Sequence, residues 1–111
     1  MEYRLSGSAK WPAQIEDCKL AVRLAARHAA QYHVDPDRIG VFGESAGGHL
    51  VACLGTMAGV KAYDAGDSGY PGVSSAVQAV VDFYGPTDFT RPRHLQRGGH
   101  AAFRGPLRHA L

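Results

Sequence analysis

The chain has 111 residues and so holds one domain at most, because a typical domain has about 150. Hydrophobic residues make up 45% of the sequence, a globular composition that excludes an intrinsically disordered protein, and the formal net charge is +2. The sequence contains no run of about 18 apolar residues and no basic start followed by an apolar stretch. We therefore expect neither a membrane span nor a secretory signal, and the cytoplasm is the compartment expected by default.

The first elements expected along the chain are the end of a strand and a long helix. Residues 2–5 alternate polar and apolar side chains and stop at a Ser-Gly-Ser turn, which is typical of a strand running into a loop. From Pro12, which suits a first helical turn, apolar side chains recur at helical spacing. These side chains are Ile15, Cys18, Val22, Ala25 and Ala29. Residues 35–37, Asp-Pro-Asp, predict a capped turn after the helix.

Strands and helices alternate in the next part of the chain. Residues 39–43 form a short apolar run, as a strand buried on both faces requires, and apolar spacing predicts a helix over 45–58. A glycine-rich loop over 59–75 leads to a second buried strand, 76–83, which the turn 84–88 closes. This alternation predicts an α/β fold with a parallel, helix-covered sheet.

The charge distribution separates the last residues from the rest. All ten acidic residues lie at or before Asp88, whereas the last 21 residues hold five arginines and no acid. We expect residues 1–90 to be the central fragment of a domain. Residues 91–111 are expected to be a basic tail that is disordered or translated out of frame.

The cysteines and helical histidines do not predict a metal site or a cofactor. Cys18 and Cys53 have no Cys-x-x-Cys spacing and fall on the apolar faces of the two helices, which favours small core residues over a disulfide. His28 and His33 are five residues apart and lack a third ligand nearby. We therefore expect no metal ion and no cofactor.

The residues Gly43-Glu44-Ser45-Ala46-Gly47 fit the pattern Gly-x-Ser-x-Gly. As a bare pattern it also fits a plain glycine-rich turn, but here a buried strand precedes it and an amphipathic helix follows. Such a strand-to-helix turn is sharp and strained, and side chains at Gly43 or Gly47 are expected to clash. The turn places the Ser45 hydroxyl at a helix N-terminus and the Ala46 N–H beside a developing oxyanion.

Three segments carry a resemblance to a known family. They read AKWPAQIEDCKLAVR (9–23), DPDRIGVFGESAGGHLVA (35–52) and VQAVVDFYGPTDF (77–89). Together they are similar to the alpha/beta-hydrolase esterases, in particular the bifunctional feruloyl and acetyl-xylan esterases, close to the hormone-sensitive-lipase-like carboxylesterases. The resemblance covers residues 2–90. It implies a partial alpha/beta-hydrolase fold in which a nucleophile elbow joins strand 39–43 to helix 45–58.

The resemblance also implies roles for the motif residues. Ser45 corresponds to the nucleophile and the Ala46 N–H to one oxyanion-hole donor, while Gly43 and Gly47 correspond to the elbow glycines. The implied activity is hydrolysis of carboxylic esters through an acyl-enzyme, as in carbohydrate esterases. The family's acid, its histidine and its His-Gly-Gly oxyanion loop have no counterpart in this sequence. The alternative is therefore a catalytically inactive, truncated fragment of such an esterase.

Residues near the motif could replace the missing partners, but each has a simpler role. Asp88 is expected to be a turn or helix-cap aspartate, and Asp82 a strand-end residue with local hydrogen bonds. His49 follows Ser45 by one helical turn and is expected to pack or cap. Three further histidines belong to the tail, which would position a general base poorly: His94, His100 and His109.

The expected partner is a small ester, with acetyl and feruloyl esters as the candidates implied by the resemblance. One helix face carries Glu16, Lys19, Arg23 and Arg27, which we interpret as a solvated stripe and not as a nucleic-acid contact. No membrane partner is expected. Because the sheet has unpaired edges, the chain is expected to associate with itself through them.

Overall fold

The computed structural model describes residues 1–64 and 70–90. The elements follow in the order α1 (Ala13–Arg27), α2 (Ala29–Tyr32), β1 (Gly40–Glu44), α3 (Ala46–Thr56), the 3-10 turn η1 (Lys61–Tyr63) and β2 (Ala79–Phe83). No helix in the described part of the chain is long and apolar enough to cross a membrane. The basic tail expected at 91–111 lies outside the described residues.

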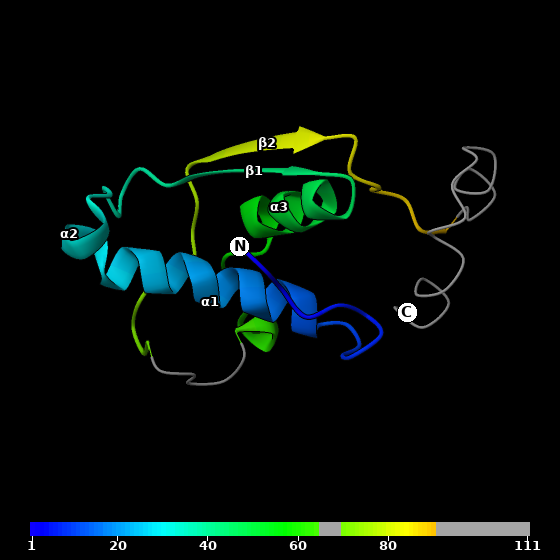
Figure 1. Ribbon diagram of the computed structural model, residues 1–111, viewed down its shortest axis with the longest axis horizontal. Coiled ribbons are helices and arrows are strands. Elements are labelled where there is room, and N and C mark those ends of the chain that lie inside the picture. Colours follow the sequence, from blue (N-terminus) through cyan, green and yellow to red (C-terminus); the bar gives the residue numbers. More distant parts are fainter. Residues whose placement is uncertain (65–69, 91–111) are drawn as a thin grey trace.

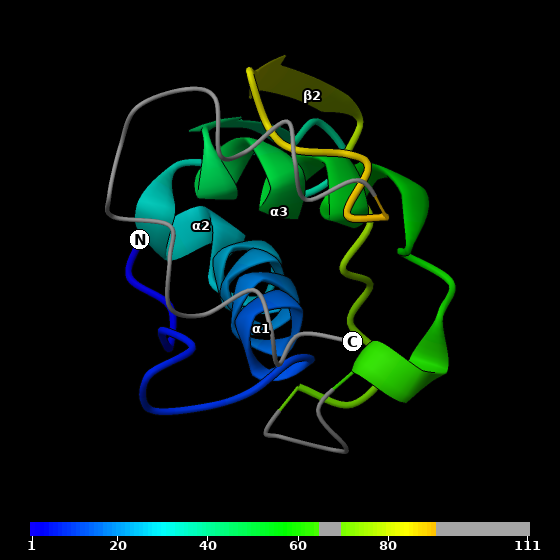
Figure 2. The same ribbon diagram turned by 90° about the vertical axis from the view of Figure 1, so that its right-hand side faces the viewer.

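The two strands form a parallel pair, as the alternation of elements predicts. Gly40 pairs with Ala79, and the register continues without interruption to Glu44 and Phe83. α3 connects the strands and packs on one face of the pair, while α1 packs on the far side of α3 (Figures 1 and 2). The described chain is therefore an α/β unit of three layers, namely the strand pair, α3 and α1.

The core lies between the two long helices. α1 supplies Ile15, Cys18 and Val22, and α3 supplies Leu50, Cys53 and Leu54. Each of these side chains is at most 6% exposed, and both cysteines are free thiols. The helical spacing of apolar residues is thus confirmed as the core pattern, and the cysteines as small core residues.

Burial changes the acidity of the Cys18 thiol. It raises the pKa from its ordinary value near 9 to about 11, with smaller contributions from Asp17 and Cys53. The folded chain keeps this proton where the unfolded chain has lost it. We therefore expect the free energy of unfolding to fall as the pH rises from about 9 to about 11, by up to about 2 kcal/mol.

Urea unfolding at several values between pH 8 and 11 measures this loss. A Cys18→Ala variant lacks the thiol, so its stability should decline less steeply with pH than that of the wild type. Parallel pH profiles for the two proteins would contradict the assignment. Below about pH 8 the thiol is protonated in both the folded and the unfolded state, so the stability of the two proteins should depend on pH in the same way there.

The prediction that both strands are buried on two faces is wrong. The register places Phe42 beside Val81 and Glu44 beside Phe83. Their neighbours Gly43, Val80 and Asp82 face α3, so these four side chains lie on the opposite face. Phe42 is 75% exposed, and Val81 and Phe83 are nearly half exposed. Among the described residues, helices cover only the α3 face of the pair, because α1 packs on α3 and not on the opposite face (Figure 2).

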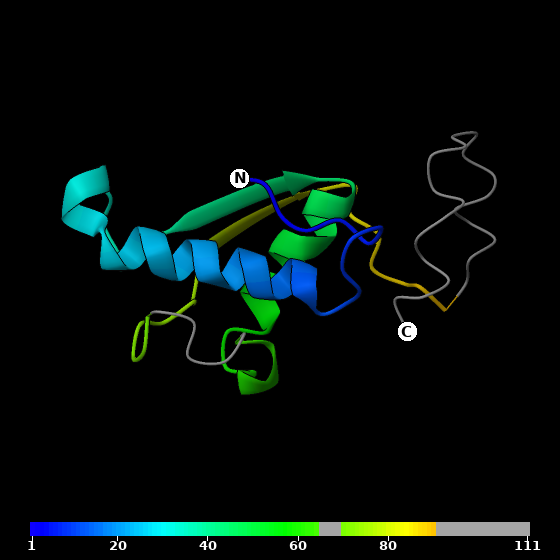
Figure 3. The same cartoon turned by 60° about the horizontal axis from the view of Figure 1, so that its bottom comes forward.

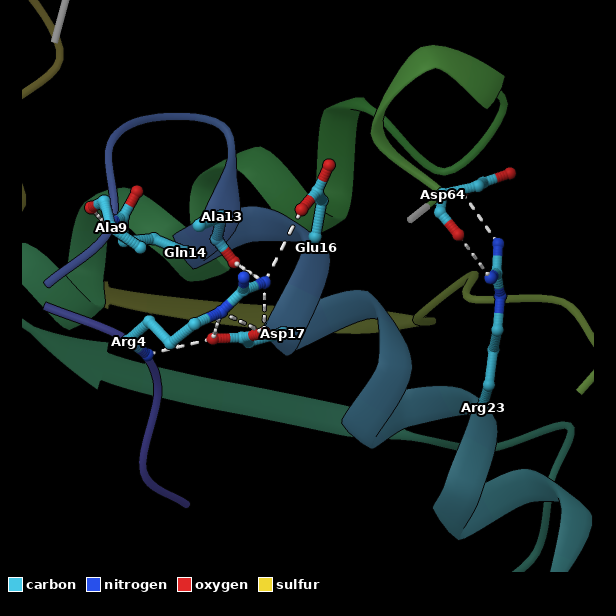
Figure 4. A network of polar contacts seen from close by, with 8 residues as sticks. All are labelled: Arg4, Ala9, Ala13, Gln14, Glu16, Asp17, Arg23 and Asp64. Carbon is cyan, nitrogen blue, oxygen red and sulfur yellow. Dashed lines mark hydrogen bonds and ion pairs between the residues drawn. The ribbon is translucent and has the colours of Figure 1, made fainter. Parts of the chain in front are cut away.

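The predicted strand at residues 2–5 is also absent from the described chain. This segment is irregular and is held to α1 by Arg4, whose backbone N–H and guanidinium both donate to the Asp17 carboxylate (Figure 4). The bond between Arg4 Nη2 and Asp17 Oδ1 is 2.7 Å long, and it lowers the pKa of Asp17. Pro12 precedes α1 as its N-cap residue instead of lying in the first turn.

Two predictions about the loops agree with the structure. The capped turn after the first helical region is confirmed, since the Asp37 N–H donates to Asp35 Oδ1 at 3.0 Å. The region 59–75 is a loop where it is described, although η1 lies within it.

The polar face of α1 is not a uniformly solvated stripe, which corrects another expectation. The Lys19 side chain is fully buried, and its ammonium donates to the Val60 carbonyl at 3.0 Å and to Asp64 Oδ1 at 2.9 Å. Arg23 also pairs with Asp64, at 2.7 Å (Figure 4). Two cations thus share one carboxylate, and together they hold the loop after α3 against α1.

Candidate active site

Ser45 lies between β1 and α3, at the carboxyl end of β1. Because the strands are parallel, β2 ends at the same edge of the pair (Figure 3). The Ser45 backbone has φ 53° and ψ −118°, a conformation that costs a residue with a side chain about 1–3 kcal/mol. Two hydrogen bonds hold it: the Ser45 N–H donates to the Phe83 carbonyl at 3.0 Å, and the Ser45 carbonyl accepts the His49 N–H at 3.1 Å. The strained turn is therefore fixed from both β2 and α3.

The glycine at position 43 is sterically required, as predicted. A Cβ there would collide with the backbone carbonyl of Gly47 and with the nitrogen of Gly48. The same argument is wrong for Gly47, since a Cβ at that position would meet no atom within 4 Å outside its own helix turn. Gly47 lies on the open side of the first turn of α3.

A glycine that the motif argument did not single out is required instead. A Cβ on Gly48 would collide with Asp82 Oδ1 and with the backbone of Gly85, and a Cβ on Gly85 would collide with the backbone of Gly48 and His49. The first turn of α3 and the turn after β2 are thus in direct backbone contact. The Gly-Gly doublet at 47–48 was the one sequence signal of this close approach.

The start of α3 provides donors beside the serine. Ala46 is the first residue of the helix, and the first N–H groups of a helix have no acceptor within it. The Ser45 side chain makes no capping hydrogen bond, so its hydroxyl does not occupy any of these donors. A hydroxyl in this position can attack a carbonyl, and an N–H such as that of Ala46 can stabilise the resulting oxyanion.

A second residue with positive φ lies next to the serine turn. Tyr84, directly after β2, has φ 46°, and its phenol donates to Glu44 Oε2 at 2.9 Å. This bond raises the pKa of Tyr84. It ties the residue after β2 to the residue before Ser45, a link that the sequence pattern did not indicate.

His49 has the packing role that its position predicts. Its Nδ1 lies 3.0 Å from the Pro86 carbonyl oxygen, and its ring makes an edge contact with Phe89 at 4.9 Å between centroids. Among residues 1–64 and 70–90, no histidine is hydrogen-bonded to the Ser45 hydroxyl. The tail histidines, His94, His100 and His109, lie outside the described residues.

The two candidate acids make local hydrogen bonds, as expected. Asp82 Oδ1 accepts the Gly85 N–H at 2.8 Å, and Asp88 Oδ1 accepts the Thr90 N–H at 2.8 Å. Asp82 also lies against Gly48, at the start of α3. In the same described residues, His, Cys, Asp and Glu form no group of three that could hold a metal ion.

Comparison with known proteins places this strand, turn and helix in a family. The BD-FAE family model matches residues 1–107, and so extends past residue 90. The chain is 39% identical over 91 residues to the probable carboxylic ester hydrolase LipM of Mycobacterium tuberculosis, and 36% identical over 96 residues to its esterase LipQ. These alignments cover 82% and 86% of the chain but only 20% and 22% of the relatives, so the chain spans about a fifth of their length.

Two solved structures are similar over the same share of the chain. One is a truncated form of a carbohydrate esterase from gut microbiota, with a TM-score of 0.78 and 40% identity. The other is a bifunctional GH43-CE protein of Bacteroides eggerthii, with a TM-score of 0.77 and 44% identity. Both matches cover 82% of this chain, and 35% and 13% of those chains. The chain therefore belongs to the BD-FAE family, and the relatives it resembles are ester hydrolases.

Proposed function

We propose that this chain carries the nucleophile segment of an alpha/beta-hydrolase that cleaves carboxylic esters, with Ser45 as the nucleophile. The observation that carries the proposal is the Ser45 backbone, at φ 53° and ψ −118° between a parallel strand and a helix. Folding tolerates such strain where the surrounding structure fixes it, and strained residues cluster at active sites. The esterase relatives support the same activity.

In the proposed reaction the Ser45 hydroxyl oxygen attacks the ester carbonyl carbon and its proton passes to a general base. The Ala46 N–H and the positive end of the α3 dipole stabilise the oxyanion. The carbon–oxygen bond to the alcohol then breaks, the alcohol leaves with the proton, and an acyl group remains on Ser45. Water releases this group as a carboxylic acid by the same route.

The proposed substrates are small acetyl or feruloyl esters on carbohydrates. The family match and the carbohydrate esterase among the structural neighbours support this class. Ser45 is partly exposed, as the approach of an ester to this serine requires. Neither nucleic acid nor a membrane has a part in this proposal.

A catalytically inactive chain is the second candidate. The observation that favours it is the absence, among residues 1–64 and 70–90, of a histidine hydrogen-bonded to the Ser45 hydroxyl. A serine hydroxyl is a weak nucleophile until a positioned base removes its proton. In this case the serine turn would be retained without turnover.

Reaction with a fluorophosphonate probe, followed by intact mass, separates the two candidates. If the chain is an esterase, wild-type protein should gain one phosphonyl group and hydrolyse p-nitrophenyl acetate, and Ser45→Ala should lower both rates by at least about 10³-fold. Ser8→Ala is the matched control, because Ser8 is an exposed serine whose hydroxyl donates to the nearby Leu5 carbonyl. Wild-type rates no higher than those of Ser45→Ala would reject the esterase proposal for this chain.

A further inference from the structure

His49 connects the first turn of α3 to two segments distant in sequence. Its backbone N–H bonds to the Ser45 carbonyl at 3.1 Å, and its side chain reaches the Pro86 carbonyl after β2 at 3.0 Å. Its ring also lies 6.0 Å from the Trp11 ring, in the segment before α1, and 4.9 Å from the Phe89 ring. One side chain therefore contacts the chain on both sides of the serine turn.

The bond to Pro86 determines that Nδ1 of His49 carries a proton. A carbonyl oxygen can only accept, so the Nδ1 that faces Pro86 must carry the proton. In the neutral ring with this tautomer Nε2 accepts, and it faces the Cys53 sulfur at 3.6 Å. Burial raises the pKa of the Cys53 thiol, which keeps the S–H available as the donor. Both ring nitrogens are thus satisfied by partners of the right kind.

The segment that His49 holds runs directly past the candidate site. Gly85 touches the backbone of Gly48 and His49 so closely that neither glycine has space for a Cβ. The Gly85 N–H is bonded to Asp82 Oδ1 at 2.8 Å, and Pro86 follows with its bond to His49. Residues 84–90 are therefore fixed at two successive points, at the same end of the strand pair as Ser45 (Figure 3).

We propose that His49 is a positioning residue for the ester hydrolysis proposed above. Its Nδ1–H bond to Pro86 and its ring contacts with Trp11 and Phe89 fix residues 84–90 against the serine turn. Phe83 directly precedes this segment, and its carbonyl accepts the Ser45 N–H. Fixing the segment therefore also fixes Ser45. The inference rests on the proposed function for its effect on reaction, but its structural part can be measured independently.

Two variants separate the hydrogen bond from the ring. His49→Phe keeps an aromatic ring beside Trp11 and Phe89 but leaves the Pro86 carbonyl without its donor. His49→Asn lacks the ring but places an amide N–H where Nδ1 lies. His28→Phe is the control, because the His28 ring contacts Tyr32 and Tyr70 and not residues 84–90.

Amide hydrogen exchange and the rate of Ser45 labelling are the two measurements. We expect His49→Phe to lower the protection of the Ser45 and Gly85 amides about tenfold, the effect of losing one hydrogen bond, and to slow labelling by a similar factor. The Met57 N–H, bonded to the Cys53 carbonyl at 2.8 Å, should keep its protection. His49→Asn should retain most of the wild-type amide protection and labelling rate, and His28→Phe should resemble the wild type in both.

Three results would overturn the inference. Unchanged protection at Ser45 and Gly85 in His49→Phe would show that the bond to Pro86 positions nothing. An equal loss at Met57 would show a general contribution to stability instead of positioning. An Nε2–H tautomer in the imidazole nitrogen spectrum would rule out the proposed bond. If no variant, wild type included, reacts at Ser45, the proposed function fails, and the exchange data still decide whether His49 holds the segment.

Discussion

Replacing Asp64 with alanine should lower the free energy of unfolding by about 3 kcal/mol. In the part of the chain that the structure describes, Asp64 is the carboxylate that pairs with the fully buried Lys19 ammonium, and it also pairs with Arg23 (Figure 4). Among residues 1–64 and 70–90, Lys19 would retain only the Val60 carbonyl as a partner, and an uncompensated buried charge is strongly destabilising. We place the effect at the lower end of the usual range because the Asp64 side chain is 24% exposed, so water can enter. Urea denaturation followed by circular dichroism measures it.

Two control variants test whether charge burial is the cause. Lys19→Met removes the buried charge itself and leaves Asp64 paired with Arg23, so we expect a change below about 1 kcal/mol. Asp17→Asn weakens the half-exposed pair with Arg4 and should also change stability by less than about 1 kcal/mol. If Lys19→Met destabilises the chain as much as Asp64→Ala, the loss comes from packing and the argument fails.

The second large effect is expected from a single methyl group at Gly43. Gly43→Ala places a Cβ against the backbone of Gly47 and Gly48, which cannot move without displacing the start of α3. We expect a loss of about 3 kcal/mol, the upper end of what overpacking causes, and a loss of any Ser45 reactivity because the serine turn must shift. Thermal unfolding and fluorophosphonate labelling measure the two effects.

Gly47→Ala is the matched control within the same motif. The new Cβ would meet no atom within 4 Å outside its own helix turn, and alanine is a better helix former than glycine. We therefore expect Gly47→Ala to leave stability unchanged or to raise it by about 0.5 kcal/mol. A loss as large as that of Gly43→Ala would show that the turn tolerates no side chain on either side of Ser45, as the motif alone predicted.

The sequence predicts the elements well where local patterns decide them. Helical spacing located α1 and α3, and the Gly-x-Ser-x-Gly pattern located the turn at Ser45. The start of the strand pair differs from the predicted boundaries, because regular pairing begins at Gly40 and Ala79. Just before it, the Gln78 N–H donates to the Ile39 carbonyl at 2.8 Å, but the Ile39 N–H donates to the Gln78 side-chain Oε1 at 2.7 Å.

Features that depend on distant residues could not be predicted from local patterns. The burial of Lys19 requires Asp64, which is 45 positions away, and a periodic pattern assigns a lysine on a polar helix face to solvent. The same holds for Gly48, whose steric requirement comes from Asp82 and Gly85. The exposure of Phe42 could not be predicted either, because an apolar strand does not reveal which of its faces a helix covers.

The hydrogen bond from the Ser45 N–H to the Phe83 carbonyl has a consequence for the order in which the fold is lost. It joins residues 38 positions apart, so it requires β2 to be docked, whereas the bond from His49 to Ser45 forms within one turn of α3. Local opening that releases β2 alone would let Ser45 relax from positive φ while α3 stayed helical. In mild denaturant, the chemistry of the serine should therefore disappear before the helical signal does.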